Sequence, residues 1–151
     1  KDEKITKAYT SPTLRAKQTA QIILKEHDVL LHEDERLKEV NFGALEGLPC
    51  SFVDTLHLES PSWLDDLEMD YTSYQGENID DVIIRQQKVL KEIEKISNEE
   101  DCIVVVGHGC SLYALIKTLL KDEKIAFPGN ASAYILCKKN NEYKLEKYLR
   151  P

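Results

Sequence analysis

The tripeptide Gly107-His108-Gly109 follows a short apolar run and precedes an amphipathic segment, so it should connect a buried strand to a helix. Such a loop lies at the carboxyl edge of a parallel sheet, where open α/β sheets bind ligands. The helix N-terminus favours an anion such as phosphate, and the two glycines let the backbone approach it closely. His108 can then hydrogen-bond a phosphoryl oxygen, act as a base or bind a metal ion. The alternative is a turn histidine bonded to a nearby carbonyl, and the tripeptide alone favours neither.

A second segment, Ser11 to Ala20, carries Arg15 in the first turn of an expected helix. Because a strand should precede this helix, Arg15 can lie at the same edge of the sheet. Its planar guanidinium can bind a phosphate through two parallel hydrogen bonds, a geometry that lysine cannot reproduce. In isolation, an arginine at such a position is more often a solvated surface charge.

A third segment, Leu37 to Gly47, places Glu39 and Glu46 in a loop that contains two glycines. A carboxylic acid beside a phosphoester oxygen can protonate the leaving alcohol if its surroundings keep it protonated. Taken alone, both glutamates would be surface acids far more often than catalysts.

The hydrophobic pattern predicts the elements that position these segments. It predicts a strand over Ile5–Thr10 and a helix over Pro12–Glu26, with Ser11 able to cap the helix and Pro12 suited to its first turn. An apolar stripe from Ile79 to Ile96 predicts the clearest helix of the chain.

The apolar run Cys102–Val106 predicts a fully buried strand of a parallel sheet, which should pair on both of its edges. Another helix follows Gly109 directly. Two late β-like runs, Ala133–Lys138 and Tyr143–Tyr148, flank a turn at Asn140-Asn141. Alternating strands and helices predict an α/β domain with a mostly parallel sheet.

Between Asn41 and Gly76 the chain is irregular, with short helices expected near Ser51–Leu58 and Ser62–Met69. A stretch this long without strong periodicity is often functional, and this one could form a lid or a wall that selects the substrate. Its aromatic residues either line an apolar wall or belong to the core, and the core interpretation is preferred. These residues are Phe42, Phe52, Trp63, Tyr71 and Tyr74.

The composition is that of a single soluble globular domain spanning residues 1–151, with 42% hydrophobic and 31% charged residues. A net charge of −7 argues against nucleic acid as a partner but permits a small anionic substrate. No stretch reaches the roughly 18 apolar residues that span a membrane, so no membrane partner and a cytoplasmic location are expected. The oligomeric state stays open. The cysteines have the spacing of neither a zinc site nor a disulfide framework, and we expect them to be reduced: Cys50, Cys102, Cys110 and Cys137.

Together these segments resemble the phosphoglycerate-mutase-like branch of the histidine phosphatase superfamily. The similarity extends through nearly the whole chain. Its motifs are Ser-Pro-x-x-Arg-Ala-x-Gln-Thr-Ala from Ser11, Leu-x-Glu-x-x-Phe-Gly-x-x-Glu-Gly from Leu37, Gly76-Glu77 ahead of a helix with Arg85, Val-Val-Val-Gly-His-Gly from Val104, and Asn130-Ala131-Ser132 before a strand.

The resemblance implies a three-layer α/β/α fold with a phosphate pocket. It implies that Arg15 clamps the phosphate, that Glu39 donates a proton to the leaving group, and that His108 stabilises the transferring phosphoryl group. Arg15, His108 and Gly109 would contact the substrate, a small phosphorylated molecule. Glu77 and Arg85 would have structural or pocket-edge roles. Neither a metal nor another cofactor is expected, because basic side chains take the role of a metal.

The family's Arg-His-Gly motif, whose histidine becomes phosphorylated, does not occur in these 151 residues. The resemblance therefore implies that the fold lacks its first strand here and that the nucleophile lies upstream of Lys1. We expect His27, His32 and His57 to be surface or structural residues. Loss of a central strand costs about 1–3 kcal/mol per unpaired backbone group against a total stability of about 5–15 kcal/mol, which favours an upstream segment over a natural fragment.

The expected function is hydrolysis of phosphomonoesters through a phosphohistidine intermediate. A phosphoglycerate mutase is one alternative, although Asn41–Gly76 is short for the insertion that encloses a mutase's substrate. The others are a non-catalytic phosphate-binding or scaffolding domain and an unrelated protein that binds anions at its sheet edge.

Overall fold

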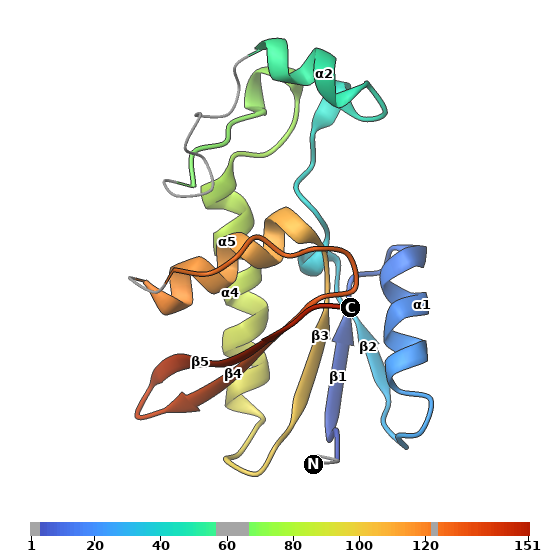
Figure 1. Ribbon diagram of the computed structural model, residues 1–151, viewed down its shortest axis with the longest axis vertical. Helices are drawn as coiled ribbons and strands as arrows, with labels where there is room; N and C mark the ends of the chain where they lie inside the picture. The colour runs from blue at the N-terminus through green and yellow to red at the C-terminus, as the bar shows by residue number, and fades with distance from the viewer. Residues whose placement is uncertain (1–3, 57–66, 122–123) are drawn as a thin grey trace.

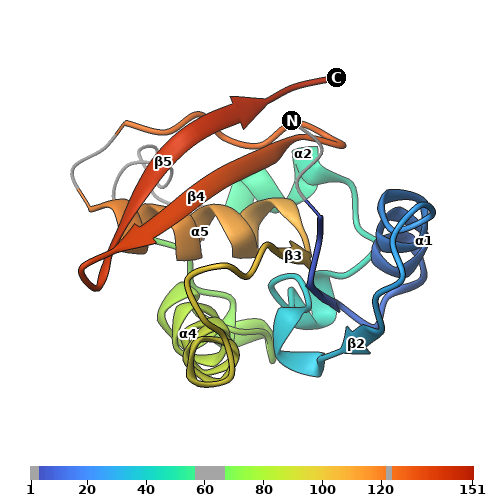
Figure 2. The same cartoon turned by 90° about the horizontal axis from the view of Figure 1, so that it is seen from below.

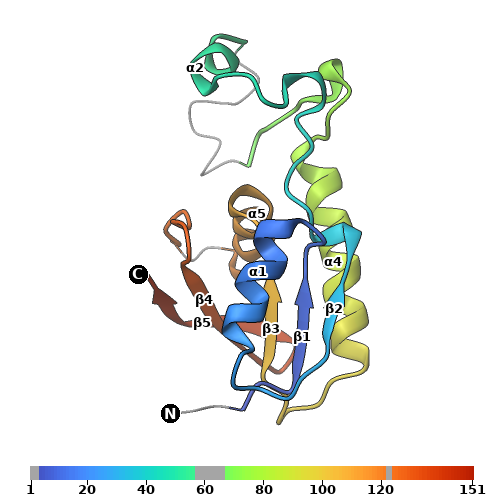
Figure 3. The same ribbon diagram turned by 90° about the vertical axis from the view of Figure 1, so that its right-hand side faces the viewer.

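The computed structural model describes residues 4–56, 67–121 and 124–151. At its centre is a parallel sheet of strands β1 (Lys7–Thr10), β2 (Leu31–Glu33) and β3 (Ile103–Val106), in the order β2-β1-β3 (Figure 1). Helices α1 (Leu14–Ile23) and α4 (Ile79–Lys95) cover its opposite faces (Figure 3). The predicted α/β/α layers are therefore confirmed.

The alternation of side chains along the strands explains the two faces of the sheet. Ala8 on β1 and Val104 on β3 pack with Leu24, just after α1. Their neighbours in sequence point the other way, and Tyr9 and Val105 pack against α4. Successive side chains of a strand point to opposite faces, so each strand contributes to both apolar layers.

One edge of the Val-rich strand has no partner in the described parts of the chain, as expected for a fold without its first strand. β3 pairs with β1 alone, and its four residues are half-buried rather than fully buried. The last two strands, β4 (Ala133–Lys139) and β5 (Glu142–Leu149), pair with each other in a separate antiparallel sheet. Between these last strands, Asn140 and Asn141 have φ angles of 51° and 67°. The left-handed conformation, which asparagine tolerates, makes the predicted tight turn.

Helix α1 is shorter at both ends than its predicted range of Pro12–Glu26. Its N-cap is Thr13, which makes no side-chain capping bond, and Ser11 Oγ accepts the N–H of Thr13 at 3.4 Å. Helix α4 agrees closely with the apolar stripe, except that Ile96 follows the helix and is 65% exposed. Asn78 caps α4 by accepting the N–H of Asp81 at 2.8 Å.

Helix α5 (Gly109–Leu120) packs on α4, and the β4–β5 hairpin lies over α5 (Figure 2). This places α5 between the hairpin and α4, beyond the β3 edge of the sheet. None of the helices in the described ranges is long and apolar enough to cross a membrane.

The described residues of the irregular segment lie above the carboxyl ends of the strands and contain only short helical pieces (Figure 1). These pieces are η2 (Gly43–Leu45), α2 (Cys50–Val53), η3 (Asp54–Leu56) and η4 (Thr72–Tyr74), and η1 (Glu35–Leu37) precedes the segment. Helix α2 and η3 agree with the helix expected near Ser51–Leu58. Most of the piece expected near Ser62–Met69 lies outside the described residues.

The core interpretation of the aromatic residues holds for Tyr71, which is fully buried and meets Phe42 edge-to-face at 4.9 Å. Tyr74 is half-buried against the same cluster. Phe52 is 50% exposed, and Trp63 lies outside the described residues. None of the described aromatic residues of this segment lines the pocket discussed below.

Candidate active site

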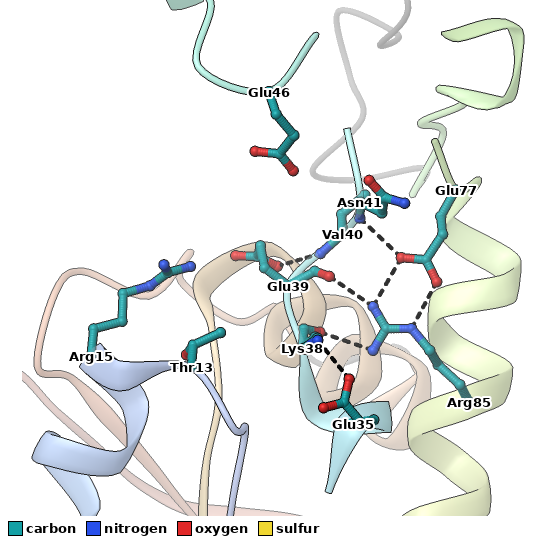
Figure 4. A pocket seen from close by; sticks show the side chains of 10 residues that line it. All are labelled: Thr13, Arg15, Glu35, Lys38, Glu39, Val40, Asn41, Glu46, Glu77 and Arg85. Carbon is teal, nitrogen blue, oxygen red and sulfur yellow. Dashed lines mark hydrogen bonds and ion pairs between the residues drawn. The ribbon is translucent and has the colours of Figure 1, made fainter. Parts of the chain in front are cut away.

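A pocket of about 550 Å³ opens at the carboxyl edge of the sheet, between the start of α1 and the start of α4 (Figure 4). Two of the three segments that carry chemically capable residues in the sequence contribute to its lining, and His108 of the third contacts Arg15. The lining residues are Thr13, Arg15, Glu35, Lys38, Glu39, Val40, Asn41, Glu46, Glu77 and Arg85.

His108 is the N-cap residue of α5 and is buried with 7% of its surface exposed. The parallel register of β1 and β3 pairs Thr10 with Val106, so the loops after the two strands lie side by side. The Nε2 atom of His108 lies 2.8 Å from Ser11 Oγ, and its Nδ1 atom lies 3.0 Å from Arg15 Nη2. The histidine thus sits between the end of β1 and the first turn of α1.

These contacts determine which ring nitrogen of His108 carries a proton. A guanidinium can only donate, so Nδ1 accepts from Arg15 and Nε2 donates to Ser11 Oγ. Burial, and next the charge of Arg15, lower the pKa of His108 below its usual value, while Glu39 opposes the shift. The imidazole is therefore neutral at pH 7 in this state.

Glu39 lies at the N-terminus of α5, where the sequence predicts an anion site. Its carboxylate accepts the N–H groups of Cys110 at 3.1 Å, Ser111 at 2.8 Å and Val40 at 3.1 Å. The unpaired N–H groups at a helix start attract negative charge, and here the protein's own carboxylate supplies it. Glu39 and His108 therefore meet at the same helix end.

Arg85 on α4 uses all of its hydrogen-bonding capacity within the protein. A guanidinium has five N–H donors. Two bind the carboxylate of Glu77, at 2.9 and 3.1 Å. The others bind the carbonyl oxygens of Arg36, Lys38 and Glu39, at 2.5, 2.9 and 2.9 Å. Arg85 thereby fixes the backbone that presents Glu39 to the pocket (Figure 4).

Two glycines allow the loops above the pocket to pack closely. Gly43 has a φ of +59°, and a Cβ there would lie 2.0 Å from the carbonyl oxygen of Tyr74. A Cβ on Gly76 would lie 2.5 Å from the carbonyl oxygen of Asn41. The N–H of Glu77 donates to that same oxygen at 2.9 Å. No other residue fits these positions without moving the backbone.

The structure brings Arg15, Glu39 and His108 together at one helix end. Gly109 begins α5, and a Cβ there would meet only the Phe127 ring at 3.6 Å, so local packing does not demand glycine. The sequence interpretation missed the contact of Ser11 with His108, treating this serine only as a helix cap. The sequence position of Ser11 indicates this contact, because Ser11 follows β1 as directly as Gly107 follows β3.

The other described histidines lie away from the pocket. His32 on β2 stacks on Tyr9 with ring centroids 5.4 Å apart. His27 follows the far end of α1, where its N–H donates to Leu24. His57 lies outside the described residues. Within the described ranges, no cluster of three or more His, Cys, Asp or Glu side chains is placed to hold a metal ion.

Comparison with known proteins identifies the family. The model of the histidine phosphatase superfamily (branch 1) matches residues 1–149. The probable phosphoglycerate mutase GpmB of Erwinia tasmaniensis is 30% identical over 135 residues, which cover 87% of this chain and 58% of that protein. The chain thus spans less than two thirds of this relative's length.

Solved structures with the same fold include a phosphatase and a mutase. A mycobacterial glucosyl-3-phosphoglycerate phosphatase, solved with VO3, has a TM-score of 0.81 and 24% identity, with 95% of this chain and 75% of that chain covered. The phosphoglycerate mutase of Bacillus anthracis str. Sterne has a TM-score of 0.78 and 23% identity, with 96% and 72% covered. At this identity, the likeness shows the fold.

Proposed function

The chain belongs to branch 1 of the histidine phosphatase superfamily, and from this we propose that it hydrolyses phosphomonoesters through a phosphohistidine intermediate. The observation that carries the proposal is the convergence of Arg15, Glu39 and His108 at the N-terminus of α5. These residues are far apart in sequence, yet Arg15 and Glu39 line one pocket and both lie beside His108. Cations and helix N–H groups around a pocket are what a phosphoryl group requires.

Arg15 is the proposed phosphate clamp. It has no carboxylate partner in the described ranges, and its guanidinium reaches the pocket from the first turn of α1. A phosphate dianion would draw Arg15 away from Nδ1 of His108. It would also favour protonation of that nitrogen, so that the imidazolium can donate to a phosphoryl oxygen.

Glu39 is the proposed proton donor to the leaving alcohol. In the present state both of its oxygens accept N–H groups, so the carboxyl group must release at least one of these bonds before it can donate. A phosphoryl group that takes over the N–H groups of α5 would release it. Substrate binding would thereby free the Glu39 carboxyl group to donate a proton.

The nucleophile is proposed to be a histidine of an Arg-His-Gly segment upstream of Lys1. Its ring nitrogen would attack phosphorus in line, forming the N–P bond as the P–O bond to the alcohol breaks and Glu39 protonates the alcohol. Water would then attack the phosphohistidine, with Glu39 accepting its proton. Phosphate and free enzyme are the products.

A mutase is the second candidate, because the matched relative from Erwinia tasmaniensis is named as a probable phosphoglycerate mutase. A mutase would return the phosphoryl group to another hydroxyl of the substrate instead of to water. The third candidate is a domain that binds a phosphate group without turnover, since Arg15 and the N-terminus of α5 would serve binding alone as well.

Intact mass and N-terminal peptide mapping of the purified protein are the first test, followed by an assay with p-nitrophenyl phosphate. An upstream Arg-His-Gly segment and steady phosphate release are expected. Phosphoryl exchange on phosphoglycerate with little phosphate release would favour the mutase. A mass that matches residues 1–151, with vanadate binding but no turnover, would favour the binding domain.

A further inference from the structure

We propose that this pocket selects phosphomonoesters whose leaving alcohol carries no second anionic group and favours a cationic amine at that end. The inference rests on the proposed function, because it concerns the alcohol half of the same substrate. It is carried by the charges around the pocket, where the guanidinium of Arg15 lies on the same side as the carboxylates of Glu39 and Glu46 (Figure 4).

Three cationic side chains line the pocket, and two of them already have anionic partners. Lys38 Nζ lies 2.5 Å from a carboxylate oxygen of Glu35. Arg85 is bonded to both oxygens of Glu77. Only Arg15 lacks a carboxylate partner within the ranges that the structure describes. A phosphate group would use Arg15, so no further cation of this lining remains for a second anion on the substrate.

The carboxylates of Glu39 and Glu46 have no cationic partner among the described residues. Glu46 points into the pocket, and one of its oxygens accepts the N–H of Phe42 at 3.2 Å. Within the described parts of the chain it forms no ion pair. Glu39 likewise contacts N–H groups rather than cations. A carboxylate on the substrate would be repelled by these two groups, whereas an ammonium group would be attracted.

The amino-acid sequence that contains Glu39, Glu46 and Glu77 has the same negative bias. Eleven residues from Glu39 to Ile84 are Asp or Glu, and none is Lys or Arg. Half of the pocket lining comes from this stretch. The whole chain has a net charge of −7, so the remainder of it is net positive. Five of the pocket-lining residues thus come from an acidic stretch of sequence, whereas Arg15 comes from a part of the chain with net positive charge.

The test compares three-carbon phosphate esters that differ only at the far end, in the full-length protein. These are 3-aminopropyl phosphate, 3-hydroxypropyl phosphate and 3-phosphooxypropanoate. We expect kcat/KM to fall in that order, with the amine exceeding the carboxylate by roughly tenfold or more at low salt. The ratio should shrink as ionic strength rises, because salt screens exposed charges.

Glu46→Gln removes one charge from the pocket lining and keeps an oxygen that can accept the Phe42 N–H. We expect it to lower the amine-to-carboxylate ratio by about three- to fivefold. Glu68→Gln is the matched control, because Glu68 is an exposed acid of the same segment that does not line the pocket. It should leave the ratio within experimental error.

Two results would overturn the inference, and they differ in what they say of the proposed function. Hydrolysis of p-nitrophenyl phosphate with equal rates for the three esters, or with the carboxylate ester fastest, would reject the selectivity and keep the phosphatase. A folded protein that hydrolyses none of the esters, including p-nitrophenyl phosphate, would reject both.

Discussion

The two arginines that face the pocket differ in how many of their donors the protein uses. Arg85 has every N–H bonded to a carboxylate or a carbonyl oxygen, and its side chain is 18% exposed. Arg15 is exposed, and among the described residues its guanidinium contacts only the neutral imidazole of His108. The same residue type thus holds the pocket's wall on one side and is open to a ligand on the other.

We therefore expect one arginine to contribute mainly to the stability of the fold and the other mainly to ligand binding. A saturated guanidinium cannot bind a substrate without losing bonds that hold the wall, so its removal should first affect stability. An unsaturated guanidinium contributes little to the folded state and has donors to offer, so its removal should first affect binding. The predictions below test this contrast in order of decreasing expected effect.

Removal of the open arginine should give the largest effect. For Arg15→Ala in the full-length protein, we expect kcat/KM for p-nitrophenyl phosphate to fall by about 10²–10³-fold and vanadate binding to weaken similarly, with a small change in stability. Arg15→Lys should recover only part of this loss. Steady-state kinetics and vanadate inhibition measure it, and unchanged vanadate binding would argue against the phosphate clamp.

Removal of the saturated arginine should act on the free energy of unfolding. Arg85→Ala leaves Glu77 and three carbonyl oxygens without their donor, and we expect a loss of about 2–4 kcal/mol in urea unfolding. Arg85→Lys should lose nearly as much unfolding free energy, because an ammonium group cannot make the five hydrogen bonds of the planar guanidinium.

The control for this variant is Lys17→Ala, which removes an exposed ion pair with Glu33 at 3.4 Å. Exposed pairs contribute about 0–1 kcal/mol, so this variant should unfold almost as the wild type does. Equal losses of unfolding free energy for Lys17→Ala and Arg85→Ala would contradict the distinction between an exposed cation and one whose N–H donors are all hydrogen-bonded.

Glu39 belongs to both sides of the comparison, since Arg85 holds its backbone and α5 holds its carboxylate. Glu39→Gln should slow hydrolysis of alkyl phosphates about 10–10²-fold more than that of activated aryl phosphates, which need no proton for the leaving group. Rates across a series of leaving groups measure this. Equal slowing across the series would argue against Glu39 as the acid.

The smallest effect concerns His108, whose pKa is lowered mainly by burial and also by Arg15. The unfolded chain binds a proton on this side chain more readily than the folded one does. Stability from this residue is therefore present at pH 7 and is lost as the pH falls below the ordinary histidine value of 6.5. Urea midpoints measured from pH 7 to 5.5 should fall less for His108→Gln than for the wild type.

The sequence predicts those parts of the fold that local patterns determine. Helix α4 follows from its apolar stripe, and the turn at Asn140-Asn141 follows from residues that tolerate a positive φ. The pocket's position follows from one rule, because loops after parallel strands share one edge of the sheet. The same rule predicts that Arg15 and His108 lie near each other, as they do.

What the sequence could not predict depends on pairings between distant segments. An apolar run such as Ile103–Val106 is equally consistent with a central strand and with an edge strand, and only the sheet order distinguishes them. The carboxylate of Glu39 occupies the helix end because Arg85 holds its backbone there, and no local pattern encodes that contact. The role of Ser11 depends on the register of β1 against β3.

The pairing of β1 with β3 also determines when the site can form during synthesis of the chain. Arg15 and His108 are 93 residues apart, whereas Arg85 and the Glu39 carbonyl are 46 apart. At a ribosomal rate of about 5–20 residues per second, β1 emerges roughly 5–20 s before its partner strand. The wall that Arg85 holds can therefore assemble first, and the end of the pocket where Arg15 meets His108 is completed last.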